Sequence, residues 1–351
     1  MTQSKNCFRK RVANFQKTFP SMKVDGFVLE NPTDLFYFTG LQFTRGRLLI
    51  TKTKTVLFVD GRYKEAAEKG SPFSVKPLEK KALEETLVAG SGKVFGFDHG
   101  LSVGAYKELK GVFAKKKKTL KGCDHPTLNV RAIKEKHELE KIKKSAALLW
   151  KGFLYVKKQL KVGISEIELA RKFEFYVKNY GAEALSFEPI VAFGSNSALP
   201  HHHSSERKLK KGELVLIDIG VVVEGYASDM TRTLFFGQVS KRLEELYKTV
   251  VASQEAALKQ CKAGVHVAEL DRVARKAMGK DVKHFLHSLG HGIGLDVHEY
   301  PSISSKEKKA TLESGMVVTI EPGLYLSGVG GIRHEDMVII TKTGHINLFK
   351  K

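Results

Sequence analysis

Five possible metal ligands in the second half of the chain constrain its fold most, because they are useful only if they meet. They are Asp218, Asp229, His291, Glu321 and Glu335. Asp218 interrupts the apolar run LVLIDIG (residues 214–220). A carboxylate in an apolar strand is costly unless it is paired or bound to a cation. The sequence therefore predicts a fold that gathers these five positions around metal.

Length and composition are those of an ordinary globular protein. The 351 residues suffice for one large or two ordinary domains, and 42% are hydrophobic. No apolar stretch approaches the roughly 18 to 20 residues that cross a bilayer, and no apolar signal core follows the N-terminus. Three scattered cysteines, Cys7, Cys123 and Cys261, indicate reduced thiols and a cytoplasmic protein.

The net charge of +21 raises the question of an anionic partner. The lysines are scattered, however, and the one tight run, residues 115–118, has no interleaved aromatic residue for base stacking. A general lysine bias explains the charge more simply. We expect neither a nucleic acid nor a membrane as partner.

Residues 1–127 are predicted to form a small α/β domain. A glycine and a proline close together at residues 122–126 precede a long charged helix, so we place the boundary at residue 128. The predicted helices are residues 7–19 and 63–69, and the predicted strands are residues 26–29, 48–51, 56–59 and 94–98.

Residues 128–351 are predicted to repeat one arrangement, two helices followed by strands. A helix over residues 131–161 and one opened by a capping box at residues 165–168 precede strands at 189–193, 214–223 and 231–235. Helices at 240–262 and 267–278 precede strands at 316–320, 323–326 and 336–340. The repetition suggests two similar halves around one site, with Asp218 and Asp229 from the first half and the other three ligands from the second.

The ligand set favours a hard divalent ion. Four carboxylates with one imidazole suit Mn²⁺, and Co²⁺, Zn²⁺ or Fe²⁺ are possible substitutes. Five ligands exceed the three or four that one zinc ion takes. They suit two ions roughly 3.5 to 4 Å apart, which can activate water and polarise a carbonyl. The predicted reaction is hydrolysis.

Taken singly, each residue has a simpler interpretation. Asp229 alone is more often a turn or cap residue, Glu335 an exposed strand residue, and Asp218 a buried, hydrogen-bonded carboxylate. The complete set in its flanking sequences favours the metal centre.

Those flanking sequences resemble the pita-bread metallopeptidases over residues 130–345, a family that includes methionine aminopeptidase, aminopeptidase P and prolidase. The resemblance implies an α/β (α+β) chain with a pita-bread catalytic domain of two pseudo-twofold halves. It also implies that Asp218 binds one ion through both oxygens, that Asp229 and Glu335 bridge, and that His291 and Glu321 bind the other ion. Glu321 is then also the general base toward water.

Two further histidines carry the resemblance to the proline-specific branch. In SNSALPH (residues 195–201), His201 matches a histidine that contacts substrate and shuttles protons. In LDVHE (residues 295–299), His298 matches one that hydrogen-bonds the substrate carbonyl, as an oxyanion-stabilising donor does. His202 and His203 also stand in the tandem. We favour His201 for the site and expect its neighbours to be structural or to face solvent.

Around the ligands, Arg333 either fixes a ligand carboxylate or contacts substrate, because alternate strand residues face the same side. His334 occupies a position where the family more often has an aliphatic residue. Tyr226 and Thr231 are expected to support the ligands by hydrogen bonds from outside.

The choice within the family depends on the first domain, which resembles that of aminopeptidase P, prolidase and creatinase. Methionine aminopeptidases lack it, and creatinases lack the metal set. The predicted bond is the one before proline, whose nitrogen has no hydrogen and whose φ is fixed. The expected partners are small peptides with proline at the second position, and a second copy in a homodimer.

A dipeptidase needs a group that reads the free carboxylate, commonly arginine. Some prolidases carry a basic residue in the stretch after His298, but residues 299–304 contain none. The sequence therefore favours aminopeptidase P over the alternative, prolidase. A non-catalytic binding protein on the same fold is a third alternative.

Overall fold

The computed structural model describes residues 5–349, which form two compact units that divide between Arg131 and Ala132. The predicted domain boundary at residue 128 lies slightly earlier in the chain. It remains a proposal for the limit of an independently folding domain.

The first unit is built on one mixed sheet of six strands in the order β4-β3-β2-β1-β5-β6. The β2–β3 hairpin has the predicted strands, with Leu48 paired to Leu57. The elements are α1 (Lys5–Gln16), α2 (Phe19–Met22), β1 (Gly26–Leu29), α3 (Pro32–Thr39), β2 (Gly46–Thr51), β3 (Thr55–Val59), α4 (Lys64–Gly70), β4 (Ser74–Pro77), α5 (Lys80–Val88), β5 (Val94–Asp98), α6 (Val103–Lys115), β6 (Thr119–Cys123) and α7 (Leu128–Ala132).

The predicted helix over residues 7–19 is wrong at its end. Helix α1 stops at Gln16, and the separate turn α2 starts at Phe19. Pro20 explains the break, because it has no N–H to donate to the carbonyl four residues earlier. Helix α3 was not predicted, although Asn31 caps it by accepting from the amide of Thr33 at 2.8 Å.

The second unit contains two helix pairs and several antiparallel sheets. Its main sheets have the strand orders β12-β9-β8 and β14-β13-β15-β18-β19. The elements are α8 (Lys136–Lys158), α9 (Glu166–Asn179), β7 (Ala184–Leu185), β8 (Ile190–Phe193), η1 (Gly194–Ala198), β9 (Glu213–Ile219), β10 (Val221–Val223), β11 (Tyr226–Ala227), β12 (Met230–Phe236), α10 (Lys241–Leu258), α11 (Val267–Met278), η2 (Gly279–His284), β13 (Gly290–Gly292), β14 (Glu299–Ile303), β15 (Val317–Ile320), β16 (Gly323–Leu326), β17 (Gly330–Arg333), β18 (Asp336–Ile340) and β19 (His345–Asn347).

Two predicted elements of this unit are interrupted. The helix over residues 131–161 is broken where Ile133 pairs with Met316. Helix α8 begins only at Lys136, where Glu135 is the N-cap and forms a capping box with Glu138. The strand over residues 214–223 is broken at Gly220. A Cβ there would lie 2.4 Å from the carbonyl oxygen of Ser228, so the chain comes too close for any side chain.

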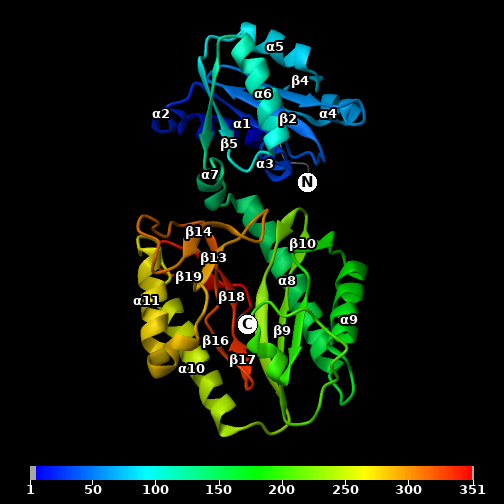
Figure 1. Ribbon diagram of the computed structural model, residues 1–351, viewed down its shortest axis with the longest axis vertical. Helices are drawn as coiled ribbons and strands as arrows, with labels where there is room; N and C mark the ends of the chain where they lie inside the picture. The colour runs from blue at the N-terminus through cyan, green and yellow to red at the C-terminus, as the bar shows by residue number, and fades with distance from the viewer. Residues whose placement is uncertain (1–4, 350–351) are drawn as a thin grey trace. The chain divides into compact units, whose positions relative to one another are not determined.

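Figure 1 shows the two helix pairs on opposite flanks of the second unit, α8 with α9 and α10 with α11, and strands such as β9, β16, β17 and β18 between them. This arrangement agrees with the predicted small α/β domain followed by a domain of two similar halves.

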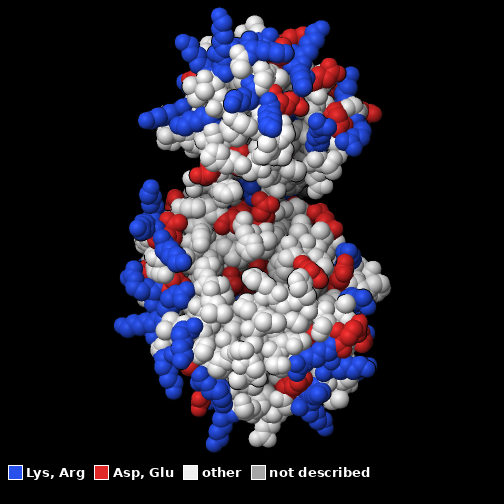
Figure 2. Space-filling view, in the orientation of Figure 1, with Lys and Arg blue, Asp and Glu red and all other residues white. Residues whose placement is uncertain are grey.

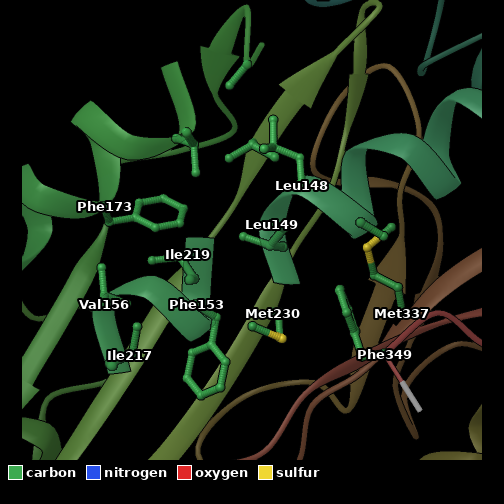
Figure 3. Packing of buried hydrophobic residues seen from close by; sticks show 14 of the residues in the cluster. Leu148, Leu149, Phe153, Val156, Phe173, Ile217, Ile219, Met230, Met337 and Phe349 are labelled. Atoms are coloured by element: carbon green, nitrogen blue, oxygen red, sulfur yellow. The ribbon is translucent and has the colours of Figure 1, made fainter. Parts of the chain in front are cut away.

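The core of the first half joins helices and strands that are distant in sequence. Figure 3 shows Phe153 and Phe173 from the two helices near Ile217 and Ile219 of β9, with Met337 and Phe349 from the end of the chain also contributing. Burial of such side chains is worth about 1.5–3 kcal/mol each. The packing therefore holds β9, which carries Asp218, in a rigid frame.

The structure locates the charged side chains and the cysteines that the composition brought into question. On the face shown in Figure 2, the Lys and Arg side chains of the second unit lie mostly toward its margins. Among the described residues, no helix combines the length and the apolar character that a membrane span requires. Cys123 and Cys261 are free thiols, and Cys261 is buried.

Candidate metal centre

Strand ends and turns of both sheets carry the five predicted ligands. Asp218 lies in β9, Asp229 just before β12, and His291 in β13. Glu321 and Glu335 lie in the turns that follow β15 and β17.

Backbone pairing brings these positions together. The amide of Glu335 donates to the carbonyl of Thr231 at 3.1 Å, and the amide of Glu321 donates to Leu289 at 2.8 Å. Thr231 in turn pairs across the sheet with Asp218. The tertiary structure therefore unites ligands that are more than a hundred residues apart.

His291 faces two carboxylates with an unprotonated ring nitrogen. Its Nδ1 lies 3.0 Å from the carbonyl oxygen of Gly292, which can only accept, so Nδ1 carries the proton. Its Nε2 lies 3.3 Å from Glu321 Oε1 and 3.7 Å from Asp229 Oδ2. Burial, followed by the charge of His298, lowers the pKa of His291 to about 4. A neutral Nε2 facing carboxylate oxygens is the arrangement of a metal-binding imidazole.

Unsatisfied oxygens give the same indication. Ligand atoms of Asp229, His291 and Glu335 all lie within 4.8 Å of one another. One oxygen each of Asp218, Asp229 and Glu335 is buried and has no hydrogen-bond partner. Unpaired buried acceptors are costly in a protein interior. A cation held between them would remove this cost.

The pKa values of the carboxylates reflect the same crowding. Burial, followed by repulsion from neighbouring carboxylates, raises the pKa of Asp229, Glu321 and Glu335 well above the usual range. Asp218 is one source of this repulsion for each of them. A bound divalent ion reverses this effect, because its charge favours the ionised carboxylates. The donor set therefore fits metal.

Arg333 connects the ligands with the groups around them. It is 4% exposed, and its Nη2 donates to Asp218 Oδ2. Its Nε donates to Thr231 Oγ1 at 3.0 Å, and its Nη1 donates to the Tyr325 hydroxyl at 2.6 Å. Of the two roles considered for Arg333, these contacts support fixing a ligand carboxylate.

The two residues expected to support the ligands have different surroundings. The Thr231 hydroxyl donates to Glu335 Oε2 at 2.8 Å while it accepts from Arg333, so it contacts a predicted ligand. The Tyr226 hydroxyl donates to Glu138 of α8 at 2.7 Å. That bond ties the strand to a helix and gives the prediction for Tyr226 no support.

His287 and Tyr325 were not singled out from the sequence. The Nδ1 of His287 faces its neighbour's carbonyl oxygen, Ser288 O, at 2.8 Å, so its Nε2 accepts from the Tyr325 hydroxyl at 2.9 Å. His287 Nδ1 also lies 4.0 Å from Glu321 Oε2. Burial raises the pKa of Tyr325 to about 12, so the phenol keeps its proton. Each residue is four positions from a predicted ligand. A spacing of four places two side chains on one face of a helix, but it is no such signal in a region predicted as strands.

The histidine tandem separates into three environments. His201 is exposed, and His202 is half-buried with its Nε2 2.8 Å from Glu166 Oε2. His203 is exposed and lies 3.4 Å from Glu188. These positions agree with the expectation that the two neighbours of His201 are structural or face solvent.

His298 lies beside the predicted ligand His291, and His201 follows a residue whose backbone contacts Arg333. The His298 ring lies 4.4 Å from the His291 ring, centroid to centroid, at an interplanar angle of 68°. Desolvation lowers the pKa of His298, and the charge of His201 contributes to the same shift. The charge of His201 also acts on His287. The carbonyl oxygen of Pro200, the residue before His201, lies 3.4 Å from Arg333 Nη1, so the backbone next to His201 is attached to a residue that contacts the ligand Asp218.

Comparison with known proteins agrees with this centre. The family model for metallopeptidase family M24 matches residues 140–342, and the model for the Creatinase/Prolidase N-terminal domain matches residues 11–133. A Xaa-Pro dipeptidase of Pyrococcus horikoshii is 35% identical over 93% of this chain and 93% of its own. The chain belongs to metallopeptidase family M24, and the prediction of a metallo-exopeptidase is confirmed.

Solved structures extend the likeness to the whole fold. Together with the two family models, they confirm the predicted fold class, a creatinase-type α/β domain before a pita-bread catalytic domain. A Xaa-Pro dipeptidase from Bacillus anthracis superimposes with a TM-score of 0.94 at 30% identity, covering 98% of each chain. An X-Pro aminopeptidase from Thermotoga maritima superimposes with a TM-score of 0.86 at 32% identity, covering 95% of this chain and 98% of its own.

Proposed function

We propose that this protein is a Xaa-Pro dipeptidase, which hydrolyses the bond between an N-terminal residue and a C-terminal proline. The observation that carries the proposal is the likeness to Xaa-Pro dipeptidases along nearly the full chain, at 35% identity and at a TM-score of 0.94. The centre offers the carboxylates, the imidazole and the flanking histidines that such a reaction needs.

The five predicted ligands are proposed to have two roles, metal binding and proton transfer. Asp218, Asp229, His291, Glu321 and Glu335 would hold two divalent ions, for which we propose Mn²⁺ as the first choice. Such ions, when bound, activate water and polarise the scissile carbonyl. Glu321 has the carboxylate to accept a proton from that water, and its second oxygen lies toward His287.

His298 and His201 are proposed to serve the substrate. Both side chains are exposed, so an incoming peptide could contact them. A protonated imidazole nitrogen at His298 would donate to the carbonyl oxygen as negative charge develops there. His201 would contact the substrate and carry protons. Arg333, whose donors face Asp218, Thr231 and Tyr325, is proposed to position Asp218 and not to touch substrate.

Aminopeptidase P is the second candidate, and it is the function that the sequence alone favoured. Residues 299–304 still lack an arginine or lysine that could read a free proline carboxylate. The similarity to an X-Pro aminopeptidase is compatible with this function as well. The relatives named as dipeptidases nevertheless shift the choice to the dipeptide.

The deciding experiment compares Ala-Pro with Ala-Pro-Ala as substrates of protein stripped of metal, with and without added Mn²⁺. A kcat/KM for Ala-Pro at least about tenfold above that for the tripeptide, a difference of roughly 1.4 kcal/mol, supports the dipeptidase. A preference for the tripeptide selects aminopeptidase P. Turnover of neither peptide by metal-loaded protein would reject both.

A homodimer and a cytoplasmic location are proposals of the same kind. Analytical ultracentrifugation of the purified protein tests the first, and fractionation of the source cells tests the second.

A further inference from the structure

We propose that Glu166 is a positioning residue that holds the segment of residues 193–205, and with it His201, in place beside the metal centre. This inference rests on the proposed function, in which His201 contacts substrate. It concerns a carboxylate outside the ligand set, and it explains how an exposed histidine on a loop keeps a defined position.

Glu166 is buried at the start of α9, and both of its oxygens accept hydrogen bonds from the segment. Its side chain is 0% exposed. Oε1 accepts from the amide of Phe193 at 2.7 Å and from Asn196 Nδ2 at 2.9 Å. Oε2 accepts from the amide of Ser205 at 3.0 Å and from its hydroxyl at 2.6 Å. One carboxylate therefore fastens both ends of the segment.

His202 adds a contact in the middle of the segment. Its Nε2 lies 2.8 Å from Glu166 Oε2. Because His202 is the next residue after His201, this bond limits the movement of the backbone that carries His201. Burial by itself would raise the pKa of Glu166, but the bonds from Ser205, His202 and the Phe193 amide outweigh it and lower the pKa. The carboxylate is thus kept ionised and able to accept these bonds.

The other side of the segment is attached to the metal centre. Ser197 Oγ accepts from the amide of Gly331 at 2.8 Å, and the carbonyl oxygen of Pro200 lies 3.4 Å from Arg333 Nη1. Arg333 also donates to Asp218. The segment is therefore bonded to the buried carboxylate of Glu166 on one side and to residues beside the metal ligands on the other. His201 lies between Pro200 and His202, which make one of these contacts each.

Replacement of the carboxylate by an amide tests this arrangement. In Glu166→Gln, the side chain keeps its size, but its NH₂ group must face donors and can no longer accept from them. We expect kcat/KM for the preferred Xaa-Pro peptide to fall about tenfold or more, because small displacements of a substrate-contacting group are costly. Glu168→Gln is the matched control in the same helix, since Glu168 is 48% exposed and lies 3.7 Å from Lys172.

A double-mutant cycle distinguishes positioning of His201 from a general structural role. If Glu166 acts through His201, Glu166→Gln costs less than about twofold in a His201→Ala background but keeps its full effect in a His298→Ala background. Equal losses in both backgrounds would overturn the proposal. His202→Ala should show a smaller loss with the same coupling, and His202→Gln, which retains a donor, should restore activity.

Amide hydrogen exchange of the full-length protein tests the same claim without turnover. Exchange should rise in residues 193–205 of Glu166→Gln and remain unchanged in the α10–α11 region. Unchanged exchange in the segment would refute the proposal that Glu166 holds it in place. If the unaltered protein cleaves no Xaa-Pro peptide, the proposed function fails, and the exchange result alone still decides whether Glu166 holds this segment.

Discussion

Thr231 shows how much one hydroxyl contributes to the candidate centre. It is fully buried, accepts from Arg333 and donates to Glu335, so it joins the guanidinium to a predicted ligand. The register of β9 and β12 places it opposite Asp218. A single small side chain therefore orients a guanidinium in β17 and a carboxylate in the turn that follows it.

We expect Thr231→Val, which keeps the shape but removes the hydroxyl, to weaken metal binding about 10- to 100-fold, as loss of an outer hydrogen bond to a ligand does. Metal titration followed by calorimetry measures the effect. Thr233→Val is the matched control, because Thr233 lies in the same strand as Thr231 and its hydroxyl bonds the backbone carbonyl and amide of Arg333. Equal metal affinity in the two variants would contradict this role of Thr231.

At the scale of elements, the turn between β13 and β14 is organised by a buried ion pair. Lys134 Nζ lies 3.0 Å from Glu299 Oε2, and the two side chains are 2% and 1% exposed. Glu299 Oε1 also accepts from the amides of Leu295 and Asp296. The pair therefore shapes the turn that carries His298.

Lys134→Met should lower the free energy of unfolding by about 3–5 kcal/mol, because it removes the buried cation that is paired with the buried Glu299 carboxylate. Urea denaturation followed by circular dichroism measures the change. Lys144→Met is the control. Lys144 Nζ lies 2.5 Å from Glu224 Oε1, but the two side chains are 60% and 43% exposed. An ion pair that is exposed in this way contributes at most about 1 kcal/mol to stability. Similar losses in both variants would show that burial does not determine the cost.

At the scale of the whole molecule, metal and protons compete for the same carboxylates. Without metal, Asp229, Glu321 and Glu335 have raised pKa values, so the folded protein retains protons that the unfolded chain releases. Its stability therefore decreases as the pH rises from about 4, the ordinary range of these groups, toward their folded pKa values. Metal binding removes this penalty, because it requires the ionised form.

The thermal stabilisation by Mn²⁺ should consequently be larger at pH 8 than at pH 5.5. At a hundredfold excess over Kd the gain is about 2.7 kcal/mol, or roughly 5–10 °C in Tm for a unit of this size. Scanning calorimetry of stripped and reconstituted protein at both pH values tests this. A stabilisation that is independent of pH, or larger at pH 5.5, would mean that these carboxylates do not bind the ion.

The sequence alone determined the elements whose apolar residues recur at a regular spacing. It also determined the candidate ligands, whose burial is unfavourable without a partner. Helix α11 and strands β1, β5, β16 and β18 have their predicted bounds, because local patterns of apolar residues decide them. The candidate ligands were visible because carboxylates in apolar strands need an explanation. The interruption at Gly220 and the break before α8 were not visible, since each depends on close approach to distant backbone.

Only the tertiary structure decided how the residues around the ligands are connected to one another. Arg333, Thr231, Tyr325 and His287 form one connected set although their spacing in the sequence is irregular. The same holds for Glu166, which lies in a helix cap by sequence and under the His201 segment by structure. Hydrogen bonds between residues that are far apart in the chain follow from the packing of whole elements, and no local pattern encodes them.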